Sequence, residues 1–316
     1  NKYMGKVAVV AVGGNSLIKD AKHQTVEDQY LAVCETSNHI ADMIELGYDV
    51  VITHGNGPQV GFILLRSERT RDILHAVPLD SCGADTQGAI GYQFQMALYN
   101  EFKKRGIKKK AATVVTQVVV DKEDPSFKNP SKPIGGFYSE QAARERKEKE
   151  GWDIVEDSGR GWRRVVASPI PKEIVEEEAI VNLIKGGFVV IAVGGGGIPV
   201  IKDDHGDLLG AAAVIDKDHA SSLLASNIKA DVFIISTAVE KASLNFGKPD
   251  EKPLDHATLE DIKKYIQEGH FKPGSMLPKM KAIVAFLEKG GEKAIITCPE
   301  KIKEALLGKT GTHIVK

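Results

Sequence analysis

VAVVAVGGN, residues 7–15, joins an uninterrupted apolar run to a glycine-rich turn. Two later stretches repeat this design: VVITHGNGP at 50–58 and FVVIAVGGGG at 188–197. A continuous apolar run is typical of a parallel strand that helices cover on both faces. Glycine lets the chain turn sharply and approach a ligand closely, and the free N–H groups of a following helix favour an anion. Three such turns on one sheet edge predict a site for several phosphate-like groups.

The overall composition is that of an ordinary α/β enzyme. The chain has 316 residues, 42% of them hydrophobic and 27% charged, with a net charge of −1. This balance argues against a nucleic-acid surface, and no apolar run approaches the roughly 20 residues of a membrane span. The three cysteines are widely spaced, as expected for free thiols in a reducing compartment. Because the first residues also lack the zones of a signal peptide, we expect a cytoplasmic protein without nucleic-acid or membrane partners.

Strand and helix patterns alternate along most of the chain, which predicts a parallel sheet covered by helices. Thr25 is placed to cap the first long helix and Gly47 to end it. The expected helices are Val26–Leu46, Pro58–Arg69, Gly83–Arg105, Lys172–Lys185, a helix starting near Asp216, His256–Glu268 and Ser275–Glu288. The expected strands, besides the three apolar runs, are Ala111–Val120, Asp231–Thr237, Lys293–Thr297 and Thr312–Val315, with a hairpin turn at Asp203–Asp207.

Residues 121–168 differ in character from the rest of the chain. They contain several prolines, a charged helix at Gln141–Glu150, and the two tryptophans Trp152 and Trp162. The segment has too few apolar residues for an independent core. We therefore expect one domain over residues 1–316, with 121–168 as an inserted lobe that protrudes as a lid and uses the tryptophans as its small core.

Three lysines stand in places that suit anion binding. Lys132 lies between two prolines, which stiffen its loop and reduce the entropy cost of aiming its side chain. Lys217 lies between Asp216 and Asp218, where a strand is expected to pass into a helix at the ligand-binding edge of the sheet. Lys279 falls in the first turn of a helix, where a cation opposes the helix dipole unless an anion compensates it.

The run Gly194–Gly197 is costly in backbone entropy, by up to about 1 kcal/mol for each glycine relative to alanine. A purely structural turn rarely needs four glycines, which favours ligand contact there. The sequence shows no Ser-His-Asp pattern, no metal-binding cluster and no general base near the glycine turns. Phosphoryl transfer to an oxygen that is already anionic needs no base, because lysines, backbone N–H groups and Mg²⁺ supply the required charge.

Taken together, the motifs of this chain resemble those of the carbamate kinases, within the amino acid kinase superfamily. The resemblance follows the family's order over nearly the whole chain, and its segments are Gly13–Asn15, His54–Gln59, Asn129–Pro133, Asp157–Trp162, Gly194–Gly197, Val214–Asp218, Gly274–Met276 with Lys279, and Lys309–Thr312. The family implies an α/β fold with an open, mainly parallel sheet in an αβα sandwich, and a homodimer.

The resemblance also implies a reaction, ATP + carbamate ⇌ ADP + carbamoyl phosphate, that often makes ATP during arginine breakdown. ATP or ADP would be bound with Mg²⁺ held mainly by the nucleotide phosphates, without a protein metal site. The implied catalytic residues are Lys132, Lys217 and Lys279, with Asp218 orienting the lysines. The implied substrate and phosphate contacts are Gly13, Gly14, Asn15, Gly55 and Asn56, and the nucleotide contacts are Gly274, Met276 and Ala238.

Val12 stands where many members of the wider superfamily have a lysine, which favours the carbamate kinase branch, in which another lysine takes that role. The chain departs from the carbamate kinase pattern itself at two places. Thr237–Val239 reads Thr-Ala-Val instead of the usual Thr-Asp-Val, which concerns the nucleotide side. Ala84–Gly88 reads Ala-Asp-Thr-Gln-Gly instead of Ala-Met-Ser-Gln-Gly, which concerns the substrate side or its packing.

Two alternatives remain open at this point. One is a kinase of the same fold that acts on another small acid or on a nucleoside monophosphate. The other is a ligand-binding sensor that keeps the fold without turnover, for which the substitution at Ala238 is the support. Formation of ATP from ADP and carbamoyl phosphate distinguishes all three possibilities.

Overall fold

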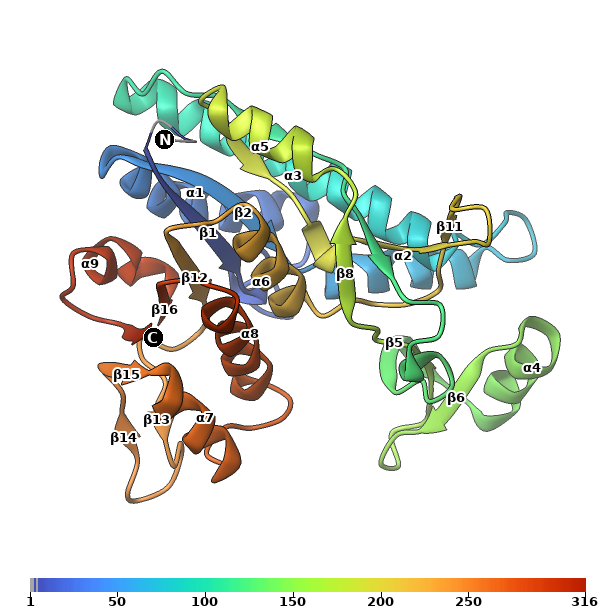
Figure 1. Cartoon of the computed structure of the whole chain (residues 1–316). Helices are drawn as coiled ribbons and strands as arrows, with labels where there is room; N and C mark the ends of the chain where they lie inside the picture. The colour runs from blue at the N-terminus through green and yellow to red at the C-terminus, as the bar shows by residue number, and fades with distance from the viewer. Residues whose placement is uncertain (1–2, 4) are drawn as a thin grey trace.

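The computed structural model describes residue 3 and residues 5–316, and it centres on an eight-stranded sheet (Figure 1). The strand order of that sheet is β15-β17-β16-β12-β1-β2-β9-β3. Its strands are β1 (Lys6–Val12), β2 (Tyr48–His54), β3 (Ala111–Thr113), β9 (Val189–Ile191), β12 (Val232–Ser236), β15 (His256–Thr258), β16 (Lys293–Thr297) and β17 (Thr312–Val315). Only the β16–β17 pair is antiparallel, so the expected mainly parallel sheet is confirmed.

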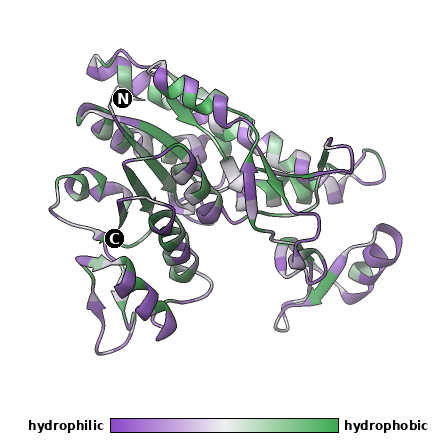
Figure 2. Cartoon of the chain, in the orientation of Figure 1, coloured by the Kyte–Doolittle hydropathy of each residue, from purple (hydrophilic) through white to green (hydrophobic). Residues whose placement is uncertain are grey.

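Both faces of this sheet are buried, which explains the uninterrupted apolar runs. In β1, Val7 and Val9 belong to one core cluster, whereas Ala8 and Val10 belong to the other. The green strands in the middle of Figure 2 and the purple outer sides of the helices show the same layering. The helices on the Ala8 side are α1 (Val26–Glu45), α3 (Leu79–Arg105) and α9 (Ile302–Leu306). Those on the Val7 side are α5 (Glu177–Lys185), α6 (Lys217–Asn227), α7 (Leu259–Gln267) and α8 (Met276–Glu288).

Local sequence signals fix the ends of several helices. Thr25 caps α1 in a capping box with Asp28, as its hydroxyl accepts from the Asp28 N–H and the Asp28 carboxylate accepts from the Thr25 N–H. Helix α2 (Gly57–Arg69) begins with a proline in its first turn, which suits a position without an intrahelical N–H bond. Gly106 ends α3 in the left-handed conformation, with φ of 69°.

A smaller sheet connects the main sheet to the lobe. It has the order β11-β10-β4-β8 and consists of β4 (Gln117–Val120), β8 (Pro171–Ile174), β10 (Ile198–Lys202) and β11 (Leu208–Gly210). Strands β10 and β11 form the antiparallel hairpin expected around residues 203–207. A further short pair, β13 (Ser243–Leu244) with β14 (Lys252–Pro253), lies near the C-terminal helices.

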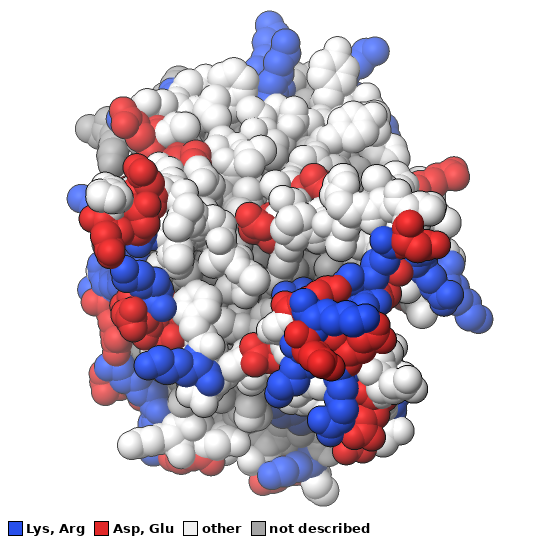
Figure 3. All heavy atoms as spheres, turned by 90° about the vertical axis from the view of Figure 1, so that its right-hand side faces the viewer, with Lys and Arg blue, Asp and Glu red and all other residues white. Residues whose placement is uncertain are grey.

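The lobe forms its own three-stranded antiparallel sheet with one helix, α4 (Glu140–Glu150), all within residues 121–168. The strands are β5 (Lys132–Tyr138), β6 (Asp153–Glu156) and β7 (Trp162–Val166). Figure 3 shows blue and red side chains interleaved on the lobe, which projects toward the viewer. Trp152 packs edge-on against Tyr138, with ring centroids 5.5 Å apart, so it contributes to the lobe's small core.

Three expected elements differ from the structure. Residues 111–120 form two strands in different sheets rather than one, because the chain passes from the main sheet to the smaller one at 114–116. The helix expected from Lys172 starts at Glu177, since Pro171–Ile174 pairs with β4 as strand β8. The helix expected from His256 starts at Leu259, since His256–Thr258 pairs with β17. In the last two cases a strand-pairing partner outweighed local propensity.

Candidate active site

The carboxyl ends of β1, β2, β12 and β16 meet at one edge of the main sheet, because these strands are parallel. Strand β1 lies between β2 and β12, so the strand order reverses at β1. Open α/β sheets usually bind ligands at such a point. A cleft of about 350 Å³ opens at this point. Its lining includes Gly13, Gly14, Asn15, Lys217, Ala238 and Lys279. The sequence prediction placed all six at the site, and the structure brings them together.

Lys217 and Lys279, which line this cleft, form an ion-paired cluster with the buried Asp218. Lys279 Nζ lies 3.2 Å from Asp218 Oδ2, and Lys217 Nζ lies 3.9 Å from Asp218 Oδ1. Lys217 Nζ also donates a hydrogen bond of 3.3 Å to the Val12 carbonyl at the end of β1. Burial is the main cause that lowers the pKa of Lys217, and the nearby Asp218 partly opposes it. The cluster therefore holds the side chains of two lysines beside the cleft.

Helix starts position these charged groups. Lys217 is the first residue of α6, and Asp216 caps that helix by accepting a hydrogen bond of 2.8 Å from the His219 N–H. The strand expected just before Lys217 is absent, as only an isolated bridge joins Ala167 to Ala213. Lys279 lies in the first turn of α8 as predicted, and Asp218 supplies the compensating anion that its position there requires.

The two glycines of the first turn have different surroundings. A Cβ at Gly13 would lie 2.9 Å from the Ser236 carbonyl, so glycine lets the ends of β1 and β12 approach each other. A Cβ at Gly14 would meet no atom within 4 Å, so packing does not explain this glycine. The turn continues as a short 3₁₀ helix, Gly14–Ser16, beside the cleft.

The second turn is held by polar contacts that link it to α3. Asn56 precedes α2, and its Nδ2 donates a hydrogen bond of 3.1 Å to Thr86 Oγ1. Thr86 is one of the residues that depart from the family pattern, and it positions the side chain of Asn56. His54 is fully buried, with Nδ1 2.8 Å from the Gly55 carbonyl, and burial is the main cause that lowers its pKa to about 4. The imidazole beside this turn is therefore neutral at pH 7.

Packing alone accounts for every residue of the four-glycine turn. A Cβ at Gly194 would lie 2.5 Å from His54 Nε2, and one at Gly195 would lie 2.2 Å from Asn56 Nδ2. A Cβ at Gly196 would lie 2.3 Å from the Ile215 carbonyl oxygen, and one at Gly197 would lie 2.2 Å from the Val118 side chain. The premise that a structural turn rarely needs four glycines is therefore wrong here, while ligand contact remains a prediction. The preceding Val193 has φ of 54°, a strained value for a β-branched residue.

A more apolar cavity of about 190 Å³ continues from the lysine cleft and shares Ala238 and Lys279 with it. Met276 lines this cavity as expected, together with Phe246 and Phe271. Gly274 is exposed and lies outside the residues that line either space. Sequence reasoning missed Phe246, because the segment around it has no hydrophobic periodicity and its contact with this cavity depends on the tertiary fold.

Lys132 lies apart from the other two lysines. It is exposed at the start of β5 and lines a separate cavity of about 580 Å³ between the lobe and the main body. Asn56 and Gly57 line the opposite side of that cavity. The second glycine turn thus lies between the cavity of Lys132 and the side chain of Lys217, whose Cδ would be 3.7 Å from a Cβ at Gly55.

Comparisons with known proteins agree with this geometry. The amino acid kinase family matches residues 6–298. This chain belongs to that family. The kinase is 52% identical over 314 residues to the carbamate kinase of Thermococcus kodakarensis, a match covering 98% of this chain and 99% of that one. It is 53% identical over 316 residues to the carbamate kinase-like protein YahI of Escherichia coli, covering 99% and 100% of the two chains.

The fold of this kinase also matches solved structures. A carbamate kinase from Giardia lamblia bound to AMP-PNP superimposes with a TM-score of 0.95 at 41% identity, with 99% of both chains covered. The amino acid kinase fold, the mainly parallel sheet and the assignment as a phosphotransferase are thus confirmed. In the part of the kinase that the structure describes, no helix is long and apolar enough to cross a membrane.

Proposed function

We propose that this kinase transfers a phosphoryl group reversibly between ATP and carbamate. The observation that carries the proposal is the Lys217–Asp218–Lys279 cluster, which lies between the Gly13–Asn15 turn and the apolar cavity of Met276. This arrangement suits a nucleotide whose base occupies the apolar space and whose phosphates reach the lysines. The high identity to carbamate kinases over the whole chain supports carbamate as the acceptor.

In this mechanism a carbamate oxygen attacks the γ-phosphorus of ATP, and the bond from that phosphorus to the β–γ bridging oxygen breaks. The attacking oxygen is already anionic, so no general base is required. Lys217 and Lys279 would neutralise charge on the transferred group, and Asp218 would hold the two ammonium groups in place. The N–H groups of the Gly13 and Gly55 turns would orient the phosphoryl and the acceptor.

The residues of the cleft fit a Mg²⁺ ion that arrives with the nucleotide. Among residue 3 and residues 5–316, no group of three or more His, Cys, Asp or Glu residues could form a protein cage for a metal. The buried Asp218 Oδ1 has no hydrogen-bond partner and is the carboxylate oxygen that could accept a water bound to the ion. Mg²⁺ typically keeps several waters and binds substrate phosphates, where it neutralises their charge.

Four further properties belong to this proposal. The lobe acts as a lid that brings Lys132 to the reacting groups. The kinase forms a homodimer, which is supported by exposed apolar side chains on the packed helices α1 and α3, namely Leu31, Tyr92 and Tyr99. It acts in the cytoplasm, where its free cysteines Cys34, Cys82 and Cys298 would remain reduced, and it makes ATP from carbamoyl phosphate in arginine breakdown.

The decisive experiment measures ATP formed from ADP and carbamoyl phosphate with Mg²⁺. Alanine variants of Lys132, Lys217 and Lys279 should each lose about 3–4 kcal/mol of transition-state stabilisation, comparable to the loss of one oxyanion donor. Lys281→Ala is the matched control, because Lys281 is exposed on the same helix as Lys279 but does not line the cleft. Unchanged turnover in all three variants would contradict the proposal.

The same assay decides between the remaining candidates. A kinase for another small acid or for a nucleoside monophosphate would make ATP only from a different phosphorylated donor in a substrate panel. A sensor would bind AMP-PNP without turning over any donor.

A further inference from the structure

A further cavity lies between the lobe and the main body, next to the cavity of Lys132. Its volume is about 320 Å³, within the lower range of small-molecule sites. Apolar side chains from both parts of the molecule line it, including Leu64 and Val77 from the body and Ile134 and Trp152 from the lobe. Nothing in the proposed phosphoryl transfer uses this space, which we call the lobe–body cavity.

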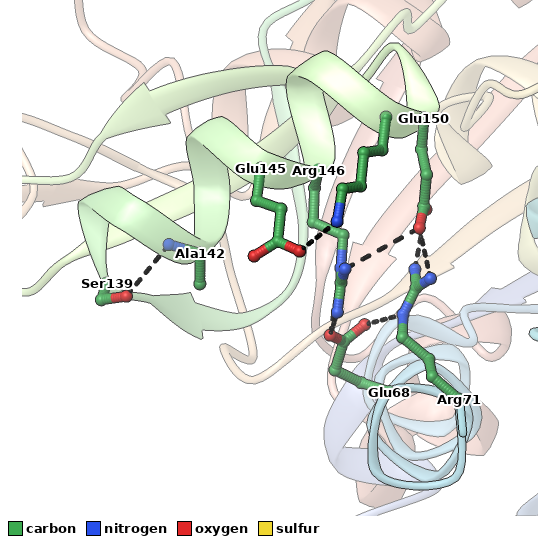
Figure 4. Close-up of polar contacts among 8 residues, drawn as sticks. Glu68, Arg71, Ser139, Ala142, Glu145, Arg146 and Glu150 are labelled. Carbon is green, nitrogen blue, oxygen red and sulfur yellow. Dashed lines mark hydrogen bonds and ion pairs between the residues drawn. The ribbon is translucent and has the colours of Figure 1, made fainter. Parts of the chain in front are cut away.

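One side of the lobe–body cavity is a neutral network of four charged residues, drawn in Figure 4. Arg71 donates to Glu68 Oε2 at 2.6 Å and forms a two-point pair with Glu150 on α4. Arg146 of α4 pairs with Glu68 and lies 3.9 Å from Glu150. Two arginines and two glutamates thus satisfy one another, and none of them needs a ligand for charge balance.

Two other charged residues line the same cavity, and their side chains make no hydrogen bond or ion pair with the residues that the structure describes. One is Arg164 on β7, whose guanidinium lies over the Trp152 ring, 4.9 Å from the centroid. Burial is the main cause that lowers the pKa of Arg164, so an anion beside it would relieve a real cost.

Asp80 is the second of these two residues and carries the opposite charge. It lies in the first turn of α3, where the helix dipole favours a carboxylate, and its side chain too has no hydrogen bond or ion pair to the residues that the structure describes. A Cβ at Gly210 would lie only 2.1 Å from Asp80 Oδ2, so glycine at this position of β11 leaves room for the carboxylate at the cavity wall.

We propose that the lobe–body cavity binds a free amino acid with an apolar side chain. The ligand's carboxylate would pair with Arg164 and its ammonium group with Asp80, while its side chain would lie against Leu64 and Trp152. A zwitterion fits because, among the residues that the structure describes, the cavity presents one unpaired cation and one unpaired anion beside a neutral network. A simple anion would leave Asp80 unmatched, and a simple amine would leave Arg164 unmatched.

Such a ligand would connect the lobe to the body. Arg164 pairs in the lobe sheet with Ile134, two residues from Lys132, whereas Asp80 belongs to the body. Binding therefore favours one position of the lobe and changes where Lys132 is held relative to the main body. The site is an effector site, distinct from the cleft that holds Lys217 and Lys279, and it goes beyond the proposed phosphoryl transfer.

Calorimetric titration of the full chain with L-leucine, L-isoleucine and L-phenylalanine tests the proposal. Fluorescence of Trp152 in a Trp162→Phe background gives a second readout, because Trp152 lines the cavity. We expect at least one amino acid to bind. Its half-molecules, for leucine 4-methylpentanoate and 3-methylbutylamine, should bind about tenfold more weakly or worse, since each lacks one charged contact.

Arg164→Gln and Asp80→Asn should each weaken amino-acid binding by about tenfold. The matched controls are Arg144→Gln on the exposed face of α4 and Asp207→Asn in the β10–β11 hairpin, which should bind as the unmodified protein does. Failure of all three amino acids to bind at millimolar concentration would overturn the proposal. Equal binding by intact ligand and half-molecules would also overturn it, and that result does not depend on a variant that folds.

Discussion

The neighbouring residues Gly13 and Gly14 are both glycine for different reasons, and substitution separates them. Gly13→Ala forces a Cβ against the Ser236 carbonyl and should destabilise the fold by about 1–3 kcal/mol. Gly14→Ala meets no atom of the chain, so it should leave the free energy of unfolding nearly unchanged and reduce kcat/KM instead. Urea unfolding and steady-state kinetics on both variants check this. A stable, fully active Gly14→Ala enzyme would contradict a ligand contact there.

His54 predicts how stability depends on pH. Its folded pKa of about 4 lies below the ordinary value near 6.5, so the unfolded chain binds more protons between these values. The contribution of neutral His54 to the free energy of unfolding is therefore complete above pH 6.5. It is lost as the pH falls toward 4, by up to about 3 kcal/mol. His54→Gln should remove this part of the pH dependence in urea unfolding, whereas His23→Gln, at an exposed site, should not. Identical pH slopes for wild type and His54→Gln would refute the prediction.

At the scale of elements, the four-residue network joins α4 of the lobe to the end of α2. The Arg71–Glu150 pair has good two-point geometry but is partly solvated, with side chains 24% and 32% exposed. We expect a coupling free energy of about 1 kcal/mol from a double-mutant cycle with Arg71→Gln and Glu150→Gln. The Lys149–Glu145 pair, which lies within α4, is the control and should give about 0.3–0.5 kcal/mol. Equal coupling free energies for both pairs would show that the pair between lobe and body is no stronger than a pair within one helix.

The sequence could predict the elements whose burial is uniform but not those defined by distant partners. β1 and β2 are recognisable because helices cover both of their faces, which makes each strand a continuous apolar run. Residues 171–174 and 256–258 look helical in isolation and become strands only because β4 and β17 lie beside them. Within the site, Lys217 and Lys279 could be found from local anomalies, whereas Phe246 and the lobe–body cavity arise only from tertiary packing.

For the whole molecule, the three lysines proposed to act together line two different spaces. Lys132 lines the cavity beside the lobe, while Lys217 and Lys279 line the cleft at the sheet edge. If all three contact the transferred phosphoryl, the lobe must close when substrates bind. AMP-PNP with Mg²⁺ and carbamate should therefore change the fluorescence of Trp152 and Trp162, which both lie in the lobe. A spectrum that stays the same with saturating ligands would contradict closure, and Lys132→Ala should still show the change.

Helix α2 links the second glycine turn to the lobe. Asn56 of that turn immediately precedes the helix, and Glu68 near its C-terminus pairs with Arg146 of the lobe. A helix of 13 residues is about 20 Å long and nearly rigid. We infer that α2 couples the acceptor turn to the lobe, and we expect a substitution at Glu68 to weaken acceptor binding from the far end of the helix.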